Sequence, residues 1–137
     1  MRMIFVNLPV KDLPKSMAFY EALGFSNNPQ FTDDTGACMV IDDNIFVMLL
    51  THEKFKGFIN GDIATNGVEV INCLSASSRA EADDFYNKAR AHGGSDWKPV
   101  MDLGFMYGTS FRDLDGHVWE LAYMDVAAAQ AQFEGAA

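Results

Sequence analysis

The sequence predicts an α+β fold that contains two related modules. The expected strands and helices follow the order β-α-β-β-β twice along the 137 residues. A Phe-Tyr pair at residues 19–20 recurs at residues 85–86, both times in the helix that follows the first strand of its half. Residues 39–50, "MVIDDNIFVMLL", also match residues 111–122, "FRDLDGHVWELA", because both read as a strand, a short Asp-containing turn and a strand. Two matches in the same order indicate an internal repeat.

The first module begins with a strand and a helix. An apolar run predicts a strand over residues 2–10, and apolar residues at helical spacing predict a helix over residues 11–25. Asp12 is a good N-cap, and Pro14 is tolerated in the first turn, where backbone N–H groups lack helical partners. Gly24 is a natural end for this helix.

The rest of the first module is expected to consist of strands. A weak strand near Phe31 is followed by strands over residues 37–42 and 44–51, which an Asp-Asp-Asn turn connects. Module one therefore spans residues 1–52. Residues 53–66 lack a clear period and read as a linker with room for one helical turn.

The second module, residues 67–124, repeats this order. A strand is expected over residues 67–76, and a helix begins at Ser78, which has the spacing of a capping box with Glu81. Three strands follow, near residues 97–101, 106–112 and 117–124. The Ala-rich tail, residues 125–137, predicts a C-terminal helix.

Composition and charge limit the classes of function. The chain has 49% hydrophobic and 21% charged residues, a mixture typical of a single globular domain over residues 1–137. No run of about 18 apolar residues predicts a transmembrane helix. The N-terminus lacks the pattern of a signal peptide, so we expect a cytoplasmic protein. The formal charge of −9 argues against nucleic acid and anionic membranes as partners.

One carboxylate lies within an apolar strand near the C-terminus. Glu120 is flanked by Trp119 and Leu121, and an unpaired carboxylate in apolar surroundings is unfavourable. We therefore expect Glu120 to face a ligand or a reacting proton and to act as a general base. The alternatives are an ion pair with a basic residue such as Arg112, or contact with water at the edge of a dimer.

Strand alternation selects further candidate residues. Side chains at every second position lie on the same face of a strand. The side chains on one face of each strand can therefore line a common site. Tyr107 is a candidate to donate a phenolic hydrogen bond across that site. The other substrate-binding candidates are Phe5, Asn7, Met48, Glu69, Ile71 and Cys73.

Two long motifs resemble a known group of proteins. "VNLPVKDLPKSMAFYEALGF" at residues 6–25 and "FRDLDGHVWEL" at residues 111–121 are similar to the vicinal oxygen chelate superfamily. This superfamily includes glyoxalase I, extradiol dioxygenases and bleomycin-resistance proteins. Within it, "IFVMLLT" and "GFMYGTSFRDLDGHVWEL" look like the predicted lactoylglutathione lyase-like branch. The resemblance implies the glyoxalase/bleomycin-resistance fold, in which two βαβββ modules form an open, cup-shaped mixed sheet.

The resemblance also implies four positions for metal ligands, two in each module. In this chain they fall on Phe5, Met48, Ile71 and Glu120, and three of these side chains do not bind a hard divalent cation. We therefore expect no divalent metal in the usual site. An atypical metal site is the alternative, and its donors would be Asn7, Glu69, Cys73 and Glu120.

Two functions are compatible with these residues. The first is a glyoxalase-like enzyme, a lyase or isomerase that acts on a small oxygenated metabolite with Glu120 as its base. The second is a metal-free binding protein of the resistance type, whose cleft is apolar and acidic. In both cases the partner is a small molecule, and the charge of −9 suits a cationic one. The resemblance implies a homodimer.

Overall fold

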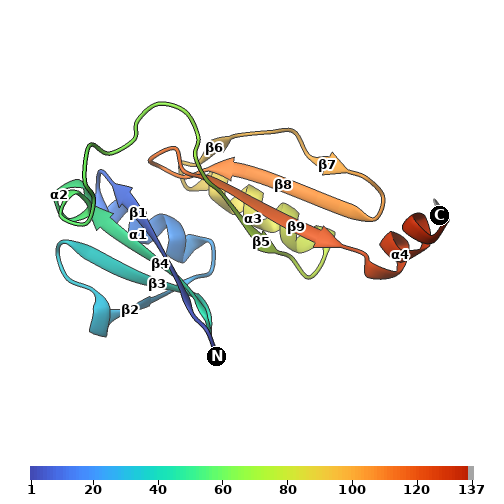
Figure 1. Ribbon diagram of the computed structural model, residues 1–137, viewed down its shortest axis with the longest axis horizontal. Helices are drawn as coiled ribbons and strands as arrows, with labels where there is room; N and C mark the ends of the chain where they lie inside the picture. The colour runs from blue at the N-terminus through green and yellow to red at the C-terminus, as the bar shows by residue number, and fades with distance from the viewer. Residues whose placement is uncertain (136–137) are drawn as a thin grey trace. The chain divides into compact units, whose positions relative to one another are not determined.

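The computed structural model describes residues 1–135 of a chain that divides into two units, Met1–Gly67 and Val68–Ala137. Each unit contains an open β-sheet with a helix packed on one face of that sheet (Figure 1). Each sheet therefore has one face that its helix covers, where the apolar core lies, and one open face.

The first unit contains a four-stranded mixed sheet. In chain order its elements are β1 (Ile4–Val10), α1 (Leu13–Ala22), β2 (Ser26–Asn28), β3 (Gly36–Asp42) and β4 (Ile45–Thr51). The strand order is β1-β4-β3-β2. Strand β1 runs parallel to β4, whereas β3 runs antiparallel to both β4 and β2. Helix α1 packs against β3 and β4.

The second unit contains a five-stranded mixed sheet. In chain order its main elements are β5 (Ile71–Ser75), α3 (Arg79–Ala91), β6 (Ser95–Asp96), β7 (Met101–Asp102), β8 (Met106–Arg112) and β9 (Val118–Met124). The strand order is β5-β9-β8-β6, and β7 also pairs with β8. Strand β5 is parallel to β9, and the other pairs are antiparallel. Helix α3 packs against β8 and β9.

The two sheets have the same topology. Elements β5, α3, β6, β8 and β9 take the places that β1, α1, β2, β3 and β4 take in the first unit, and β7 is an additional short strand. Both sheets combine parallel and antiparallel pairs, and neither closes on itself. The predicted α+β fold of two βαβββ modules with open, mixed sheets is therefore confirmed.

Helix α1 forms where the sequence predicts it. The Asp12 carboxylate accepts a hydrogen bond from the Lys15 N–H at 3.1 Å and so caps the first turn. Gly24, with a φ of 105°, follows the helix in a conformation that favours glycine. The helix and its C-cap bury a continuous apolar stripe, Leu13, Phe19, Tyr20 and Leu23.

Helix α3 begins at a capping box that involves one more residue than predicted. Ser78 Oγ accepts a hydrogen bond from the Glu81 N–H at 3.0 Å, as expected. The Glu81 carboxylate, however, accepts from the Ser77 N–H at 3.0 Å rather than from the Ser78 N–H. The fully buried side chains of this helix are those of Ala82 and Ala89. Helix α3 therefore buries less apolar surface than α1.

The weak strand predicted near Phe31 is wrong. The chain forms a short 3-10 helix, η1 (Pro29–Phe31), directly after β2. Pro29 fixes a φ suited to the start of a helical turn, and the Asn28 side chain accepts a hydrogen bond from the Gln30 N–H at 3.0 Å. These two local effects end the strand before Phe31.

The strand predicted over residues 67–76 is shorter than expected. It begins at Ile71 because its parallel partner, β9, begins at Val118, the residue that pairs with Ile71. The residues before Val118 belong to a turn and cannot form strand hydrogen bonds with residues 67–70. Residues 67–70 therefore have no strand partner and are exposed.

The strand predicted near residues 97–101 is replaced by β6 and β7. Both pair with β8, but residues 97–100 leave the ladder between them. Pro99 has no N–H to donate. The Ser110 hydroxyl accepts a hydrogen bond from the Lys98 N–H at 3.1 Å and donates one to the Lys98 carbonyl at 3.2 Å. One side chain thus replaces the backbone pairing of this stretch, which we call the 97–100 segment.

Two short helices lie outside the two sheets. Helix α2 (His52–Lys56) follows β4 directly and is capped by Thr51. Helix α4 (Val126–Gly135) lies in the Ala-rich tail, of which residues 136–137 are outside the described residues. No helix in the described part of the chain is long and apolar enough to cross a membrane.

Candidate functional site

A buried aspartate organises the turn that precedes β9. The Asp113 carboxylate accepts hydrogen bonds from the Asp115 N–H at 2.9 Å and from the His117 N–H at 2.8 Å. Asp113 is 4% exposed, so these contacts satisfy a carboxylate inside the protein. The turn fixes where β9 begins. Because a shift of one residue exchanges the two faces of a strand, the turn also fixes the face that carries Glu120.

Glu120 lies in the middle of β9 between two polar neighbours. It pairs in register with Cys73 on β5 and with Ser110 on β8. The adjacent Trp119 and Leu121 are buried on the face that α3 covers, so the Glu120 side chain points to the open face. It is half-buried there. The sheet therefore holds a carboxylate on its open face at the boundary with solvent.

The Cys73 thiol lies beside this carboxylate, where it can donate a hydrogen bond to it. Cys73 is exposed as a residue, but partial desolvation of its thiol is the main effect that raises its pKa, and the negative charge of Glu120 and a hydrogen bond to Glu120 raise the pKa further. A raised pKa leaves little thiolate at neutral pH. Cys73 therefore acts as a neutral hydrogen-bond donor beside Glu120 rather than as a nucleophile.

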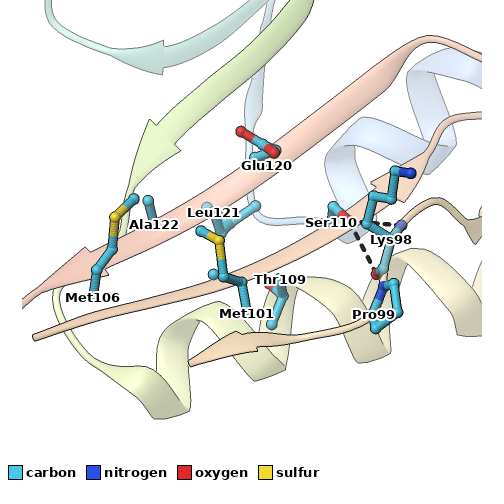
Figure 2. Close-up of a pocket in the computed structure, with 10 residues that line it drawn as sticks. Lys98, Pro99, Met101, Met106, Thr109, Ser110, Glu120, Leu121 and Ala122 are labelled. Atoms are coloured by element: carbon cyan, nitrogen blue, oxygen red, sulfur yellow. Dashed lines mark hydrogen bonds between the residues drawn. The ribbon is translucent and has the colours of Figure 1, made fainter. Parts of the chain in front are cut away.

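A pocket opens over β8 and β9 on the same face. Its volume is about 140 Å³. Met101 and Met106 provide apolar surface, Glu120 provides a carboxylate, and Lys98 also contributes to the lining. Figure 2 shows Met106 and Lys98 toward its two ends, with Glu120 between them. We call it the Glu120 pocket, and its full lining is Lys98, Pro99, Met101, Met106, Gly108, Thr109, Ser110, Glu120, Leu121 and Ala122.

A second and larger pocket borders the 97–100 segment. Its volume is about 400 Å³, and Tyr86 of α3 and Asp96 contribute to its lining. The Tyr86 hydroxyl donates a hydrogen bond to Asp96, and Arg90 forms an ion pair with Asp96 at 3.3 Å. Because its carboxylate already has two partners, this pocket is a weaker candidate for ligand binding than the Glu120 pocket.

Arg112 does not neutralise Glu120. Its Nε donates a hydrogen bond to Ser95 Oγ at 3.1 Å. Among the side chains that the structure describes, no ion pair within 4 Å involves Glu120. The ion pair considered for Glu120 on the sequence is therefore absent from the described residues.

Tyr107 lies on the other face of the second sheet. Its hydroxyl donates a hydrogen bond to Asp83 of α3 at 2.5 Å, and the Arg79 guanidinium lies 4.8 Å from its ring centroid. This hydrogen bond raises the pKa of Tyr107. Since Glu120 points away from α3, the prediction that Tyr107 donates across the site is wrong.

Glu69 and Ile71 differ in their relation to Glu120. Ile71 is the first residue of β5, is 48% exposed and shares the open face with Cys73, two residues further on. Glu69 precedes β5 and is exposed, so strand alternation does not place it on this face. The structure therefore brings Ile71, Cys73 and Glu120 together on one face and leaves Glu69 outside the sheet.

Phe5, Asn7 and Met48 share the open face of the first sheet. Phe5 is the register partner of Phe46, and their rings stack with centroids 4.8 Å apart. Asn7 is the register partner of Met48, and its Nδ2 donates a hydrogen bond to the Phe5 carbonyl at 3.2 Å. The polar group of Asn7 is thus bonded within its own strand, and the rest of this group is apolar.

The side chains around Glu120 do not fit a divalent metal. Its register partners offer one thiol and one hydroxyl, whereas a bound metal normally has about three or four protein ligands. The three remaining positions implied by the resemblance, Phe5, Met48 and Ile71, carry no oxygen or nitrogen donor. Among the described residues, no group of three His, Cys, Asp or Glu side chains could hold a metal.

The residues of the Glu120 pocket that escape prediction from the sequence include Lys98, Met101, Met106 and Ser110. Ser110 and Met106 carry a usable signal, because counting back along the hairpin from the turn at Asp113 pairs Ser110 with Glu120. Lys98 and Met101 carry no such signal, since the irregular 97–100 segment breaks the alternation of the strand.

Comparison with known proteins places this geometry in a wider group. A family model described as "Bleomycin resistance protein-like N-terminal" matches residues 2–42. The hypothetical protein SA1046 from S. aureus is 31% identical with a TM-score of 0.77, and the similarity covers 90% of this chain and 94% of that chain. No curated protein sequence matches.

Two further solved structures share the fold at low identity. A glyoxalase/bleomycin resistance protein/dioxygenase family enzyme from Burkholderia phytofirmans PsJN is 16% identical with a TM-score of 0.76, over 90% of this chain and 99% of that chain. A glyoxalase-related enzyme from Fulvimarina pelagi is 17% identical with a TM-score of 0.78, over 92% and 90% of the two chains. The protein thus has the glyoxalase/bleomycin-resistance fold and belongs to the same family as SA1046 from S. aureus.

Proposed function

We propose that this protein binds a small organic molecule in the Glu120 pocket and that binding needs no metal. The observation that carries the proposal is a half-buried carboxylate at an apolar pocket, with no ion-pair partner within 4 Å among the described side chains. A carboxylate in such a place favours a ligand with an ammonium group or another strong donor. The formal charge of −9 attracts a cationic ligand over longer distances.

Phenethylamine is a suitable probe because it joins one aromatic ring to one ammonium group. Chelator-treated protein should bind it, and Glu120→Gln should weaken binding about tenfold or more, because a neutral acceptor replaces a charged one. Glu21→Gln makes the same change at an exposed position of α1 and should leave the affinity unchanged. Isothermal titration calorimetry measures all three proteins.

Two results would contradict this proposal. One is equal affinity of the wild-type protein and Glu120→Gln for phenethylamine. The other is binding that disappears with the chelator and returns with Zn²⁺ or Ni²⁺, because a metal would then be part of the site.

A second candidate is a glyoxalase-like lyase or isomerase with Glu120 as its general base. It is supported by the resemblance, which puts Glu120 at a ligand position, and by two proteins of the same fold that are named as enzymes. A base must lie within hydrogen-bond reach of the proton that it removes, and Glu120 lines a pocket that a substrate can enter. Activity as a lactoylglutathione lyase rests on the sequence resemblance.

The lyase candidate has a direct assay. The methylglyoxal–glutathione adduct is offered to the purified protein, alone and with Ni²⁺, Zn²⁺, Mn²⁺, Fe²⁺ or Co²⁺. Turnover that falls about a hundredfold or more in Glu120→Gln would support Glu120 as the base. No turnover under any condition rules out a lactoylglutathione lyase and leaves the binding proposal intact.

We also propose, on the resemblance, that the protein is a cytoplasmic homodimer. Several apolar side chains on the sheets are about half exposed, among them Ile4, Phe5 and Ile71, as expected where a second surface covers them. Sedimentation equilibrium would give the mass in solution, and a monomer at all concentrations contradicts the dimer.

A further inference from the structure

The Glu120 pocket carries two opposite charges that do not neutralise each other. Glu120 and Lys98 both line it, yet no ion pair within 4 Å joins them in the described part of the chain. The Lys98 ammonium lies instead 5.7 Å from the centroid of the Trp97 ring. A ligand in the pocket therefore meets a carboxylate and an ammonium group that are both available to it.

One buried side chain fixes the backbone of Lys98. The Ser110 hydroxyl, 5% exposed, bonds to both the N–H and the carbonyl of Lys98, at 3.1 and 3.2 Å. Ser110 is also the register partner of Glu120 on β8 and β9. Ser110 therefore connects the backbone of Lys98 to the position on β8 that lies beside Glu120. These contacts fix the backbone of Lys98 relative to the strand that carries Glu120.

The apolar part of the pocket suits one ring. The pocket measures about 140 Å³. An apolar cavity of about 150 Å³ is known to hold benzene. Met101, Met106 and Ala122 line the pocket, and the flexible thioether side chains of the methionines adapt to an aromatic or aliphatic ring.

We infer that the Glu120 pocket recognises a zwitterionic small molecule with a ring-sized apolar body. Its ammonium group contacts Glu120, and its carboxylate contacts Lys98. The inference rests on the proposed function, because it takes the Glu120 pocket as the ligand site. Lys98 is the anion-binding group, since Arg112 is bonded to Ser95 and does not line the pocket.

Three compounds with one skeleton test the assignment. L-phenylalanine carries both charges, phenethylamine lacks the carboxylate and 3-phenylpropionate lacks the ammonium group. At one pH and ionic strength, titration calorimetry should show L-phenylalanine bound about tenfold more tightly than phenethylamine, with 3-phenylpropionate weakest.

Two variants assign the charges to residues. Lys98→Met should remove the higher affinity for L-phenylalanine over phenethylamine without weakening the binding of phenethylamine. Only the carboxylate of L-phenylalanine loses its partner in this variant. Glu120→Gln should weaken the binding of L-phenylalanine and of phenethylamine by similar factors. Arg112→Met is the matched control, since it removes a positive charge outside the pocket, and it should preserve the advantage.

The possible failures are distinguishable. Equal affinity of the wild-type protein for L-phenylalanine and phenethylamine, both dependent on Glu120, overturns this inference and leaves the proposed function intact. An advantage that Lys98→Met and Arg112→Met reduce equally also overturns it, because the general charge of the protein would then be the cause. No Glu120-dependent binding of any of the three compounds overturns both proposals.

Discussion

At the scale of single residues, Glu120 contributes to the raised pKa of its neighbour Cys73. Partial desolvation of the exposed Cys73 raises the pKa of its thiol, and the Glu120 charge and hydrogen bond raise the pKa further. A carboxylate that accepts a hydrogen bond from the thiol stabilises the neutral thiol relative to the thiolate. The pair therefore keeps Cys73 protonated on the open face at neutral pH.

Glu120→Gln should lower the pKa of Cys73 and accelerate its alkylation. The variant removes the charge of Glu120 but keeps the partial desolvation of Cys73, so the pKa should fall only part of the way to its ordinary value. The rate of reaction with iodoacetamide as a function of pH measures this change. Cys73→Ser gives the background from Cys38, which is buried. An unchanged pH profile in Glu120→Gln would mean that the two side chains do not interact.

Strand alternation predicts part of this arrangement. It places Cys73 and Glu120 on one face, and the structure shows them as register partners. Tyr107 lies on the covered face because it is an odd number of positions from Ser110, the partner of Glu120. The position of Lys98 depends on a hydrogen bond between segments distant in sequence, so no local pattern predicts it.

At the scale of elements, one arginine attaches β7 to α3. Arg79 donates to both carboxylate oxygens of Asp102, at 2.8 and 3.2 Å, and to the Gly104 carbonyl at 3.1 Å. The Gly104 N–H in turn donates to Asp102 at 2.9 Å. Strand β7 has two residues, and one of them is Met101 of the Glu120 pocket. Arg79 therefore helps to position one side of that pocket.

Asp102→Asn should reduce stability at neutral pH and have little effect in acid. The hydrogen bond from Arg79 holds the pKa of Asp102 below its usual range in the folded protein. A carboxyl with a lowered folded pKa contributes stability above its unfolded pKa, and this contribution is lost as the pH falls through the folded value. The free energies of unfolding in urea of the wild-type protein and the variant should therefore differ at neutral pH and converge in acid.

Asp84→Asn is the matched control for this prediction. Asp84 forms a single ion pair with Lys88 at 2.8 Å within α3, whereas Asp102 accepts two hydrogen bonds from Arg79 and one from Gly104, and single exposed pairs stabilise proteins little. Its loss should change stability less than the loss of Asp102. An effect of Asp102→Asn that is the same at neutral and acid pH would show that the charge of Asp102 is not its cause.

The sequence predicts elements best where the signal is local. Strands β3 and β4 lie close to the apolar runs that predict them, and Asp12 caps α1 as predicted. The start of β5 at Ile71 depends instead on where its partner strand β9 begins. The break between β6 and β7 depends on Pro99 and on a distant hydroxyl. Pairing partners and long-range hydrogen bonds thus account for both errors.

At the scale of the whole molecule, the two units hold their helices by different means. Helix α1 buries large apolar side chains, Phe19 and Tyr20 among them, whereas α3 buries two alanines. A fully buried large apolar side chain contributes about 1.5–3 kcal/mol, far more than a methyl group. Helix α3 relies on polar contacts such as the hydrogen bond from Thr109 Oγ1 to the Ala82 carbonyl at 2.7 Å.

Amide hydrogen exchange should separate the two helices. Segments held by few buried apolar groups open more often, so the amides of α3 should exchange faster than those of α1 under native conditions. Exchange followed by mass spectrometry or NMR measures both helices in one sample. Equal protection of α1 and α3 would mean that the polar contacts of α3 compensate fully for its smaller apolar burial.

The repeat is the feature of the whole molecule that the sequence predicts well. The recurring Phe-Tyr pair and the two strand–turn–strand segments lie at equivalent places of α1 and α3, and of the β3–β4 and β8–β9 hairpins. The structure adds the difference between the repeats. Stacked phenylalanines occupy the open face of the first sheet, and a charged pocket occupies that of the second.

The 97–100 segment has a consequence for the length of the ligands that this protein accepts. Lys98, Pro99, Thr109 and Ser110 line both pockets of the second unit, and one hydroxyl attaches the segment to β8. Displacing the segment would break the two hydrogen bonds of Ser110 and no strand pair. A ligand that extended from Glu120 toward Tyr86 on α3 would therefore have to displace a segment that one serine holds in place.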